Sequence, residues 1–331
     1  MRILLAVQGT GNGHLSRARE IIPHLQYYGD LDIAVSGTQA DVELGYPVRY
    51  RFHGLSFIFG KKGGVDKWLT YKTLDLKQLY HDIRHFPLQN YDLIINDFEP
   101  VTAWACKLRK IECIALSHQS SFLSKLTPRP AGSPSPSELI LSHYAPCSAA
   151  IGFHFQPYDT FIHTPVIRKE IREFGPVNKG HYTVYLPAYD DDFLRPYLQL
   201  VPGVNWEVFS KHTRNESRHG NVWTRPVENI SYNKSVVTCE GLLTGGGFEG
   251  PAEAMFLGKK VLAVPMTGQW EQQCNAEAMR RMGVPVVPLI SRGFDEILKN
   301  WVYNQAPLKV DFPDQTAEII SRLVFNYGKN V

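Results

Sequence analysis

The sequence predicts an α/β protein of two lobes, each built around a doubly wound, Rossmann-like parallel sheet. Three observations support this fold class. The chain has 331 residues, about twice the usual size of one domain. Short apolar runs alternate with helical patterns in both halves, as expected of parallel sheets covered by helices. A segment rich in proline and glycine, residues 156–180, separates the two halves.

In the first half, residues 3–7 form a β-rich apolar run, typical of a strand buried on both faces. The pattern that follows indicates a helix, because its apolar residues recur on one side. Those residues are Leu15, Ala18, Ile21, Ile22 and Leu25. Further strands are predicted at residues 31–36, 92–96 and 112–116, with a helix at residues 101–108.

The second half has the same alternation. Strands are predicted at residues 182–186, 206–210, 236–243 and 260–264, with a helix at residues 248–258. We therefore predict an N-terminal α/β domain at residues 1–160, a linker at residues 161–180 and a C-terminal α/β domain at residues 181–331. The last helix is a candidate to return to the first lobe.

Composition and charge narrow the class of protein. The 35 Lys and Arg residues against 32 Asp and Glu residues leave a net charge of +3, too small to indicate nucleic-acid or anionic-membrane binding by electrostatics alone. The five cysteines form no CxxC pair and are predicted to be reduced thiols. No signal-peptide pattern and no apolar run of about 18 residues occurs. The sequence thus predicts a cytoplasmic protein.

The stretch "LLTGGGFEGPAEA", residues 242–254, reads as a strand, a glycine turn and the start of a helix. Glycines at such a turn let the backbone approach a bulky ligand, and the N–H groups of the new helix then point at it. This nest favours a phosphate or diphosphate. A plain tight turn between strand and helix is the alternative.

Two glutamates follow these glycines four residues apart, so Glu249 and Glu253 can share a helix face. A carboxylate beside a phosphate site is unfavourable unless it accepts hydrogen bonds from neutral donors. The ribose hydroxyls are the obvious donors to Glu253. Stabilising the helix dipole is the alternative, and it suits Glu249 better.

The next strand ends at Pro265. A polar loop follows, with the acid and amides of "QWEQQ", and a helix is expected to begin near Cys274. Such groups can bind sugar hydroxyls.

Residues 245–283, "GGGFEGPAEAMFLGKKVLAVPMTGQWEQQCNAEAMRRMG", resemble the nucleotide-sugar donor segment of two-domain (GT-B fold) glycosyltransferases. They are similar to the C-terminal domain of glycosyltransferase family 28 and to the signature of UDP-sugar-dependent glucosyltransferases. The resemblance runs from about Val236 to Gly283. It implies two lobes facing each other across a cleft. It also implies roles for individual residues: backbone contacts to the donor diphosphate from Gly245, Gly246, Gly247 and Phe248, ribose binding by Glu253, and donor-sugar binding by Glu271, Gln272 and, with weaker support, Gln269.

The sequence departs from that signature near the phosphates. Plant-type transferases carry His, Asn and Ser side chains where this chain has Gly245, Glu249 and Gly250. The backbone nest is therefore the main expected anchor of the diphosphate, and Glu249 would repel a phosphate unless its side chain points away.

The N-terminal stretch "VQGTGNGHLSRA" is a second glycine-rich loop. Its spacing is GxGxG, where a dinucleotide fingerprint would have GxGxxG, and it resembles the first glycine loop of the same transferases. The resemblance places Gly11, Asn12 and Gly13 opposite the donor diphosphate and makes His14 the general base or an acceptor contact. An imidazole titrates near neutrality and can take a proton from a hydroxyl. A helix-capping or surface histidine is the alternative.

A histidine base usually needs an acid to orient it. Asp97 ends the strand in "YDLIINDFEP" and resembles the partner acid of the inverting glucosyltransferases. The alternative is that Asp97 caps the helix beginning near Val101. Glu99 is a weaker candidate for the same site.

Asp190–Asp192 in "YDDDF" is the one pattern that invites a metal hypothesis, because metal-dependent transferases hold a divalent ion with an Asp-x-Asp pair. Capping of the following helix explains these acids better. No His or Cys spacing suggests zinc. A helix N-terminus can neutralise the leaving diphosphate, so the sequence predicts neither a metal nor a cofactor.

The sequence therefore predicts a metal-independent, inverting glycosyltransferase that moves a hexosyl group from a UDP-sugar to an acceptor hydroxyl. The acceptor is a small molecule, a glycan or a lipid-linked species, and the aromatic and lysine-rich residues 52–75 suggest peripheral contact with the inner face of a membrane. A nucleotide-sugar epimerase or hydrolase of the same fold and a non-catalytic nucleotide- or glycan-binding relative are the alternatives. The glycine spacing counts against a Rossmann oxidoreductase.

Overall fold

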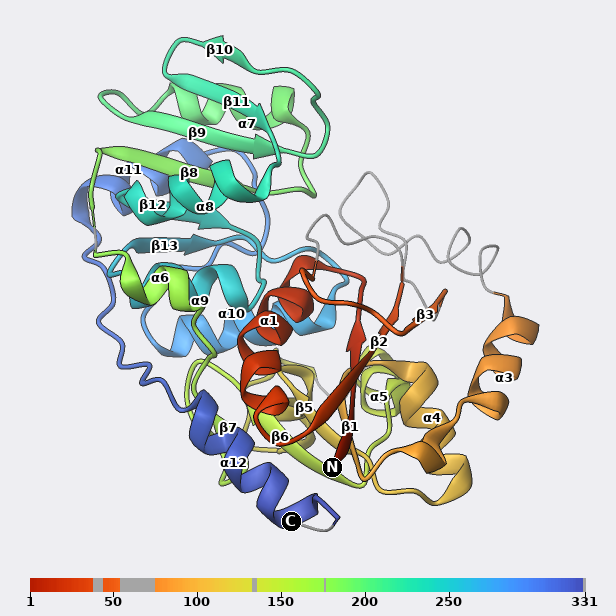
Figure 1. Cartoon of the computed structure of the whole chain (residues 1–331). Helices are drawn as coiled ribbons and strands as arrows, with labels where there is room; N and C mark the ends of the chain where they lie inside the picture. The colour runs from red at the N-terminus through yellow and green to blue at the C-terminus, as the bar shows by residue number, and fades with distance from the viewer. Residues whose placement is uncertain (38–43, 54–74, 133–135, 176, 330–331) are drawn as a thin grey trace.

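The computed structural model describes residues 1–331 except 38–43, 54–74, 133–135, 176 and 330–331. The predicted fold class is confirmed: the described residues form two lobes, each with its own largely parallel sheet and covering helices (Figure 1). Most of residues 52–75, for which membrane contact was predicted, lie outside the described residues. No helix in the described part of the chain combines the length and hydrophobicity that crossing a membrane requires.

The first sheet has seven strands in the order β3-β2-β1-β4-β5-β6-β7, all parallel to their neighbours. The order reverses beside β1, the topological switch point at which ligands bind in open α/β sheets. Strand pairing sets Val7 of β1 against Asp97 of β4, both at the carboxyl ends of their strands. The strands are β1 (Arg2–Gln8), β2 (Asp30–Ser36), β3 (Tyr50–Phe52), β4 (Leu93–Asp97), β5 (Ile114–Ser117), β6 (Ala149–Phe153) and β7 (Ile162–His163).

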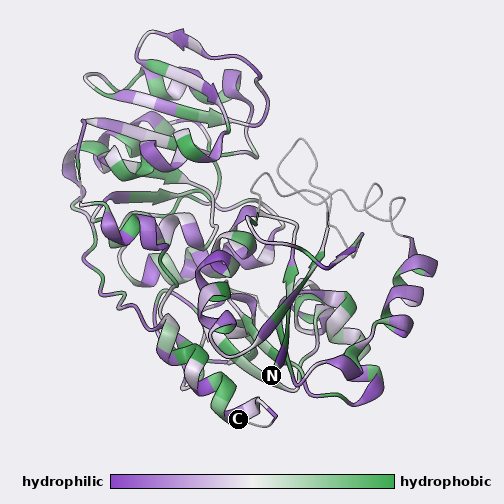
Figure 2. Ribbon diagram, viewed as in Figure 1, coloured by the Kyte–Doolittle hydropathy of each residue, from purple (hydrophilic) through white to green (hydrophobic). Residues whose placement is uncertain are grey.

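Helices cover both faces of this sheet. The five apolar residues predicted to form one side of the first helix are all buried on α1. By contrast, α3 has no buried residue and is drawn mostly in hydrophilic purple (Figure 2). The helices are α1 (Asn12–Gln26), α3 (Leu76–His85), α4 (Pro100–Arg109) and α5 (Pro136–Tyr144), with short 3-10 turns at Leu88–Asn90 and Gln119–Leu123.

The second sheet has six strands in the order β10-β11-β9-β8-β12-β13. Only the pairing of the edge strand β10 with β11 is antiparallel within this described sheet. The strands are β8 (His181–Tyr185), β9 (Asn205–Ser210), β10 (Ser217–His219), β11 (Val222–Pro226), β12 (Gly241–Thr244) and β13 (Lys260–Ala263). The helices are α6 (Lys169–Glu173), α7 (Asp191–Gln199), α8 (Asn229–Thr238), α9 (Glu249–Phe256), α10 (Trp270–Arg281), α11 (Phe294–Asn304) and α12 (Thr316–Tyr327).

Two boundary predictions in this lobe were wrong. Residues 236–243 were predicted as one strand, but Val236 and Val237 belong to the last turn of α8, where they are buried in the core. Tertiary packing here outweighs the strand preference of β-branched residues. The helix expected near Cys274 begins earlier, at Trp270, because that side chain is buried and packs on Phe122 of the first lobe, with ring centroids 5.2 Å apart.

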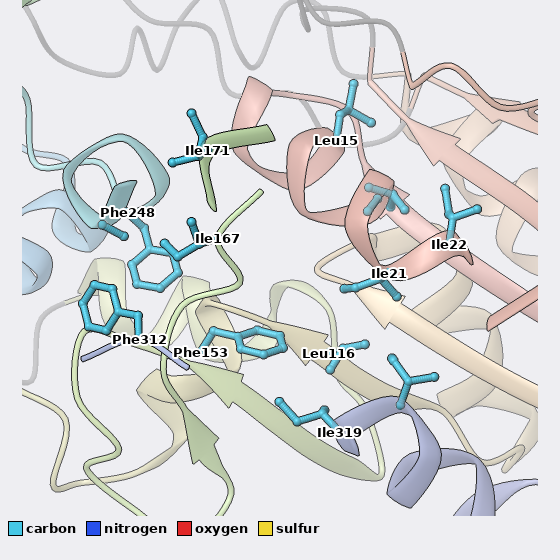
Figure 3. Close-up of a cluster of buried hydrophobic side chains, with 14 of the residues drawn as sticks. Leu15, Ile21, Ile22, Leu116, Phe153, Ile167, Ile171, Phe248, Phe312 and Ile319 are labelled. Carbon is cyan, nitrogen blue, oxygen red and sulfur yellow. The ribbon is translucent and has the colours of Figure 1, made fainter. Parts of the chain in front are cut away.

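A continuous hydrophobic cluster joins the two lobes (Figure 3). Ile21 of α1, Phe248 at the start of α9 and Ile319 of α12 all belong to it. The chain crosses back after the second lobe, and α12 packs on α1 of the first lobe. Residues 161–180, predicted as the linker, contain β7, which pairs with β6 of the first sheet, and α6. The shared core fixes the lobes in register, so that loops from both can form one site.

Candidate active site

The helices that follow the two glycine-rich loops meet where the lobes face each other. On the first lobe, Gly11 stands at the N-cap of α1, and Asn12 and Gly13 form its first turn. A Cβ on Gly13 would collide with the carboxylate of Glu249, the first residue of α9 on the second lobe. A side chain at position 13 would force the Glu249 carboxylate to move, and glycine allows the approach without that movement. The predicted diphosphate-binding loops are thus brought together.

His14 and Asp97 form a hydrogen-bonded pair at this junction. His14 Nδ1 lies 2.7 Å from Asp97 Oδ1, and both side chains are largely buried. Although burial alone would raise the pKa of Asp97, the charge of Arg17 and the contact with His14 lower it below its ordinary value. An ionised carboxylate can only accept, so Nδ1 carries a hydrogen, and in the neutral ring Nε2 keeps its lone pair. Nε2 can therefore take a proton.

The capping alternative for Asp97 was wrong, because a different acid caps α4. Both carboxylate oxygens of Glu99 accept backbone N–H bonds, from Val101 and Thr102, each at 2.7 Å. Ser36 also donates to Glu99. Glu99 is fully buried, and burial raises its pKa. The cap is what frees Asp97 to face His14.

Arg17 is a site residue that the sequence reasoning missed. Its side chain is 2% exposed, and its Nε and Nη2 donate to the two oxygens of Asp97 at 3.0 and 2.7 Å. Its Nη1 donates to Glu249 Oε1 at 2.5 Å, across the junction of the lobes. Burial lowers the pKa of Arg17, but Asp97 and Glu249 more than offset this effect and raise it. Its position three residues after His14, on the same face of a helix, was the available signal.

The Arg17–Glu249 ion pair shows where the Glu249 side chain points, which decides whether it would repel a phosphate bound at the glycines. The Glu249 carboxylate points to the first lobe and lies over Gly13, rather than away from the junction. Arg17 compensates its charge. Glu249 therefore lies between the two loops that were expected to share a diphosphate.

The loop between β12 and α9 is held from behind by α10. Gln272 Oε1 accepts from the backbone N–H groups of Gly246 at 3.1 Å and Met266 at 3.0 Å. A Cβ on Gly246 would collide with the backbone of Gln272, whereas one on Gly247 would meet open space. Gly245 also borders the Gln272 side chain. The helix thus fixes the loop and leaves the Gly247 side open.

Glu271 contacts the first lobe directly. Its Oε2 accepts from Gln119 Nε2 at 3.1 Å, and the same amide nitrogen lies 3.4 Å from His14 Nε2. Burial raises the pKa of Glu271, so its carboxyl keeps a proton to higher pH than an exposed glutamate does. Gln269 is the N-cap residue of α10, and its buried Oε1 has no hydrogen-bond partner among the described residues. Gln119 and Glu271 thus lie close to His14.

Glu253, predicted to bind ribose, lies further along α9. Arg168 donates to both of its carboxylate oxygens, from Nε and Nη2, at 2.6 Å each. The Glu253 side chain is 7% exposed, and Arg168 is held in turn by Glu170 and Asn233. Each carboxylate oxygen has further lone pairs and can accept another donor. Ribose binding by Glu253 stays a prediction.

Phe248 and His118 form a second contact between the lobes that the sequence did not indicate. The two rings stack with centroids 3.9 Å apart and an interplanar angle of 5°. His118 Nε2 lies 2.9 Å from Asn275 Oδ1, and Asn275 donates to the carbonyl of Gly246 at 3.0 Å. Burial lowers the pKa of His118 to about 3, so this ring is uncharged at neutral pH. The Phe248 side chain is thus structural, and only its backbone can contact a ligand.

Asp190–Asp192 lie at the start of α7. Asp190 accepts from the N–H of Asp192 at 2.9 Å, Asp191 accepts from Ser210 at 2.7 Å and Asp192 pairs with Arg195 at 2.6 Å. The capping interpretation is confirmed. Within the described ranges, no group of three or more His, Cys, Asp or Glu side chains is arranged to hold a metal ion.

The comparisons with known proteins agree with this arrangement. The sequence model of the family described as "Glycosyl transferase family 1" matches residues 1–300. No curated protein matches the chain. Solved structures that are similar, all with a TM-score above 0.5, are the spinosyn forosaminyltransferase SpnP (14% identity, 99% of this chain and 96% of that one, TM-score 0.60), LpCGTa in complex with UDP (12%, 98% and 94%, 0.60) and MurG of Acinetobacter baumannii (11%, 97% and 98%, 0.56). At these identities the likeness shows a shared two-lobed GT-B fold.

Proposed function

The chain belongs to glycosyl transferase family 1, and on that premise we propose that it moves a hexosyl group from a UDP-sugar to an acceptor hydroxyl, without a metal and with inversion. The observation that carries this proposal is the His14–Asp97 pair, 2.7 Å apart, at the junction of two glycine-rich loops from opposite lobes. The first loop supplies a base, and the second supplies the N-terminus of a helix for a leaving diphosphate.

The proposed reaction is a single displacement at the anomeric carbon. His14 Nε2 removes the proton of the acceptor hydroxyl, whose oxygen attacks the anomeric carbon. The bond from that carbon to the diphosphate oxygen breaks, and UDP leaves with the electron pair. Attack opposite the leaving group inverts the configuration. Asp97 holds the imidazole through Nδ1 and stabilises the imidazolium, while Arg17 keeps Asp97 ionised.

The diphosphate is placed at the loop from Gly245 to Phe248. The open side of Gly247 and the N–H groups at the start of α9 offer hydrogen-bond donors and the positive end of a helix dipole. Gly11, Asn12 and Gly13 would approach from the other lobe. This supports departure of UDP without a metal ion.

The polar groups of α10 suit the donor sugar. Glu271 is linked to the proposed base through Gln119, and the Oε1 of Gln269, which has no partner among the described residues, can accept from a sugar hydroxyl. Gln272 would contribute by accepting the Gly246 N–H, which fixes the glycine loop beside the donor sugar. Glu253 would accept from the ribose hydroxyls. LpCGTa was solved with UDP, which agrees with a uridine nucleotide here.

The acceptor is proposed to be a small molecule, a glycan or a lipid-linked species, and not a nucleic acid, since the net charge is only +3. We place the reaction in the cytoplasm, with peripheral contact to the membrane through residues 52–75. That segment's lysines and aromatic residues support the placement.

A nucleotide titration tests the donor. In EDTA, UDP is expected to raise the melting temperature and to bind more tightly than GDP or dTDP. It should also bind more tightly than 2′,3′-dideoxy-UDP, because that analogue cannot donate to Glu253. Isothermal calorimetry measures each affinity. Indifference to UDP, or a requirement for a divalent metal, would overturn the proposed donor. Equal affinity for the dideoxy analogue would remove only the ribose role of Glu253.

Charge removal at Glu249 gives a second test. The Glu249→Gln variant is expected to bind UDP roughly fivefold to tenfold more tightly, because it lacks the negative charge beside the proposed diphosphate. It also frees an Arg17 N–H to contact a phosphate oxygen. Glu296→Gln, at an exposed acid of α11, is the matched control and should leave the affinity unchanged. Weaker UDP binding by Glu249→Gln would place the diphosphate elsewhere.

A further inference from the structure

A hollow lies on the second lobe, away from the candidate active site. It has a volume of about 660 Å³, and none of the residues assigned above to catalysis or to the donor lines it. Its floor is the outer part of the sheet, β9, β11 and β10, and its wall is α8. We call it the Trp223 cavity.

The cavity exists because one face of the sheet is only partly covered. On the far face, Trp206 and Val208 of β9 are buried in a core with Leu194 of α7 and Leu298 of α11. On the near face, α8 lies over β8, where Ser235 contacts His181 and Thr183. Figure 1 shows α8 in front of this sheet and α7 behind it. α8 also reaches β9, where Tyr232 packs on Phe209, and the cavity lies between α8 and the outer strands.

That open face carries an aromatic ring between cationic side chains. Strand pairing sets Arg218 of β10 opposite Trp223 of β11, and Arg225 lies two residues further along β11, on the same face. The guanidinium carbons of Arg218 and Arg225 lie over the Trp223 ring, 4.3 and 4.1 Å from its centroid. Cation–π contacts of this kind hold both guanidinium groups in place.

The positive charge of the cavity exceeds the negative charge that faces it. Lys179, Arg218, Arg225 and Lys234 line it, against the acids Glu207 and Glu228. Arg225 is paired, through contacts of 3.8 Å to Glu207 and 3.1 Å to Glu216. The side chains of Lys179, Arg218 and Lys234 make no ion pair with any described residue.

Cations grouped in a hollow repel one another. The low-dielectric walls concentrate their electric field, which attracts an anion into the hollow. A guanidinium fork fixed against a ring is preorganised for two parallel bonds to a phosphate or carboxylate. Asn205 and Ser231 add neutral polar groups at the rim. We propose that the Trp223 cavity binds a small polyanion, a molecule carrying two or more phosphate or carboxylate groups. Its volume suits a small-molecule ligand.

Fluorine NMR on protein labelled with 5-fluorotryptophan tests this site separately from the active site. The chain has six tryptophans, and the Trp223 signal is assigned with Trp223→Phe. Tripolyphosphate and citrate are the probes. At least one is expected to shift the Trp223 signal saturably. Trp270, at the start of α10, reports any binding near the active site instead.

The matched variants separate a built site from general surface charge. Lys179→Ala/Lys234→Ala removes two lining cations without touching the ring, and should weaken binding on the order of tenfold or more. Lys299→Ala/Arg280→Ala removes two cations of the same lobe outside the cavity and should not. A shift with tripolyphosphate alone identifies a phosphate ligand, and one with citrate alone a carboxylate ligand. An unmoved Trp223 signal with both probes, or equal affinity in both double variants, overturns the proposal.

Discussion

Replacement of His14 by alanine is expected to lower the rate of sugar transfer about 10³-fold while leaving UDP affinity nearly unchanged. Because Asp97 takes the Nδ1 hydrogen, the neutral imidazole keeps its Nε2 lone pair for proton removal. UDP would be bound by the backbone of the other lobe, so its affinity should not depend on His14. The variant therefore separates chemistry from binding.

The measurement is single-turnover release of UDP from the UDP-sugar that binds most tightly, with a panel of hydroxyl acceptors. His24→Ala is the control, because His24 is on the same helix, nearly three turns beyond the proposed base. It should react at the wild-type rate. If His14→Ala also kept that rate, His14 would not be the base. If release in the wild type were as fast without any acceptor, the enzyme would be a hydrolase or epimerase instead.

The fold could be predicted from the sequence because the buried strands are nearly continuous apolar runs. Ile3–Val7 and Leu93–Asn96 are such runs, and both are buried in the first sheet. The short edge strands β3, β7 and β10 gave no comparable signal. The β-branched pair before β12 was assigned to a strand although its burial comes from a helix, a distinction that periodicity alone cannot make for short runs.

The site was predictable where the chemistry lies in one contiguous stretch. His14 directly follows the first glycine turn, the second glycine turn leads straight into Phe248 and Glu249, and Asp97 ends a recognisable strand. Arg17 and His118 were missed because their roles depend on partners in the other lobe, Glu249 and Asn275, which no local pattern links to them. Glu99, the weaker candidate for the partner acid, instead caps α4.

Replacement of Arg17 by methionine should cost about 3 kcal/mol of folding free energy at neutral pH, because it leaves the buried Asp97 carboxylate without its guanidinium partner. Methionine keeps the unbranched apolar stem and removes only the charge and its hydrogen bonds. Arg19→Met is the matched control, since Arg19 is on the same helix and bonds to a single carbonyl, that of Leu44. Urea unfolding of the three proteins measures the difference.

The pH dependence of that loss distinguishes an ionic role from a packing role. In the wild type the folded pKa of Asp97 is lowered, so its contribution is complete above the unfolded value of about 3.8 and is lost as pH falls through the lower folded value. Without Arg17, burial would raise the pKa of Asp97 instead, and stability would be lost as pH rises through the window between the unfolded and folded values. The destabilisation of Arg17→Met relative to wild type should therefore be larger at pH 7 than at pH 4.

The same substitution should impair transfer as well as stability. A carboxyl that keeps its proton can donate to Nδ1 of His14 as well as accept from it, so the ring would lose its fixed tautomer, and the rate should fall more than tenfold in protein that is still folded. The fall should lessen as pH rises and Asp97 ionises, a recovery that a merely misfolded variant would not show. A pH-independent loss of both stability and rate would mean that Arg17 serves packing alone, and that the junction of the lobes does not set the charge of the catalytic pair.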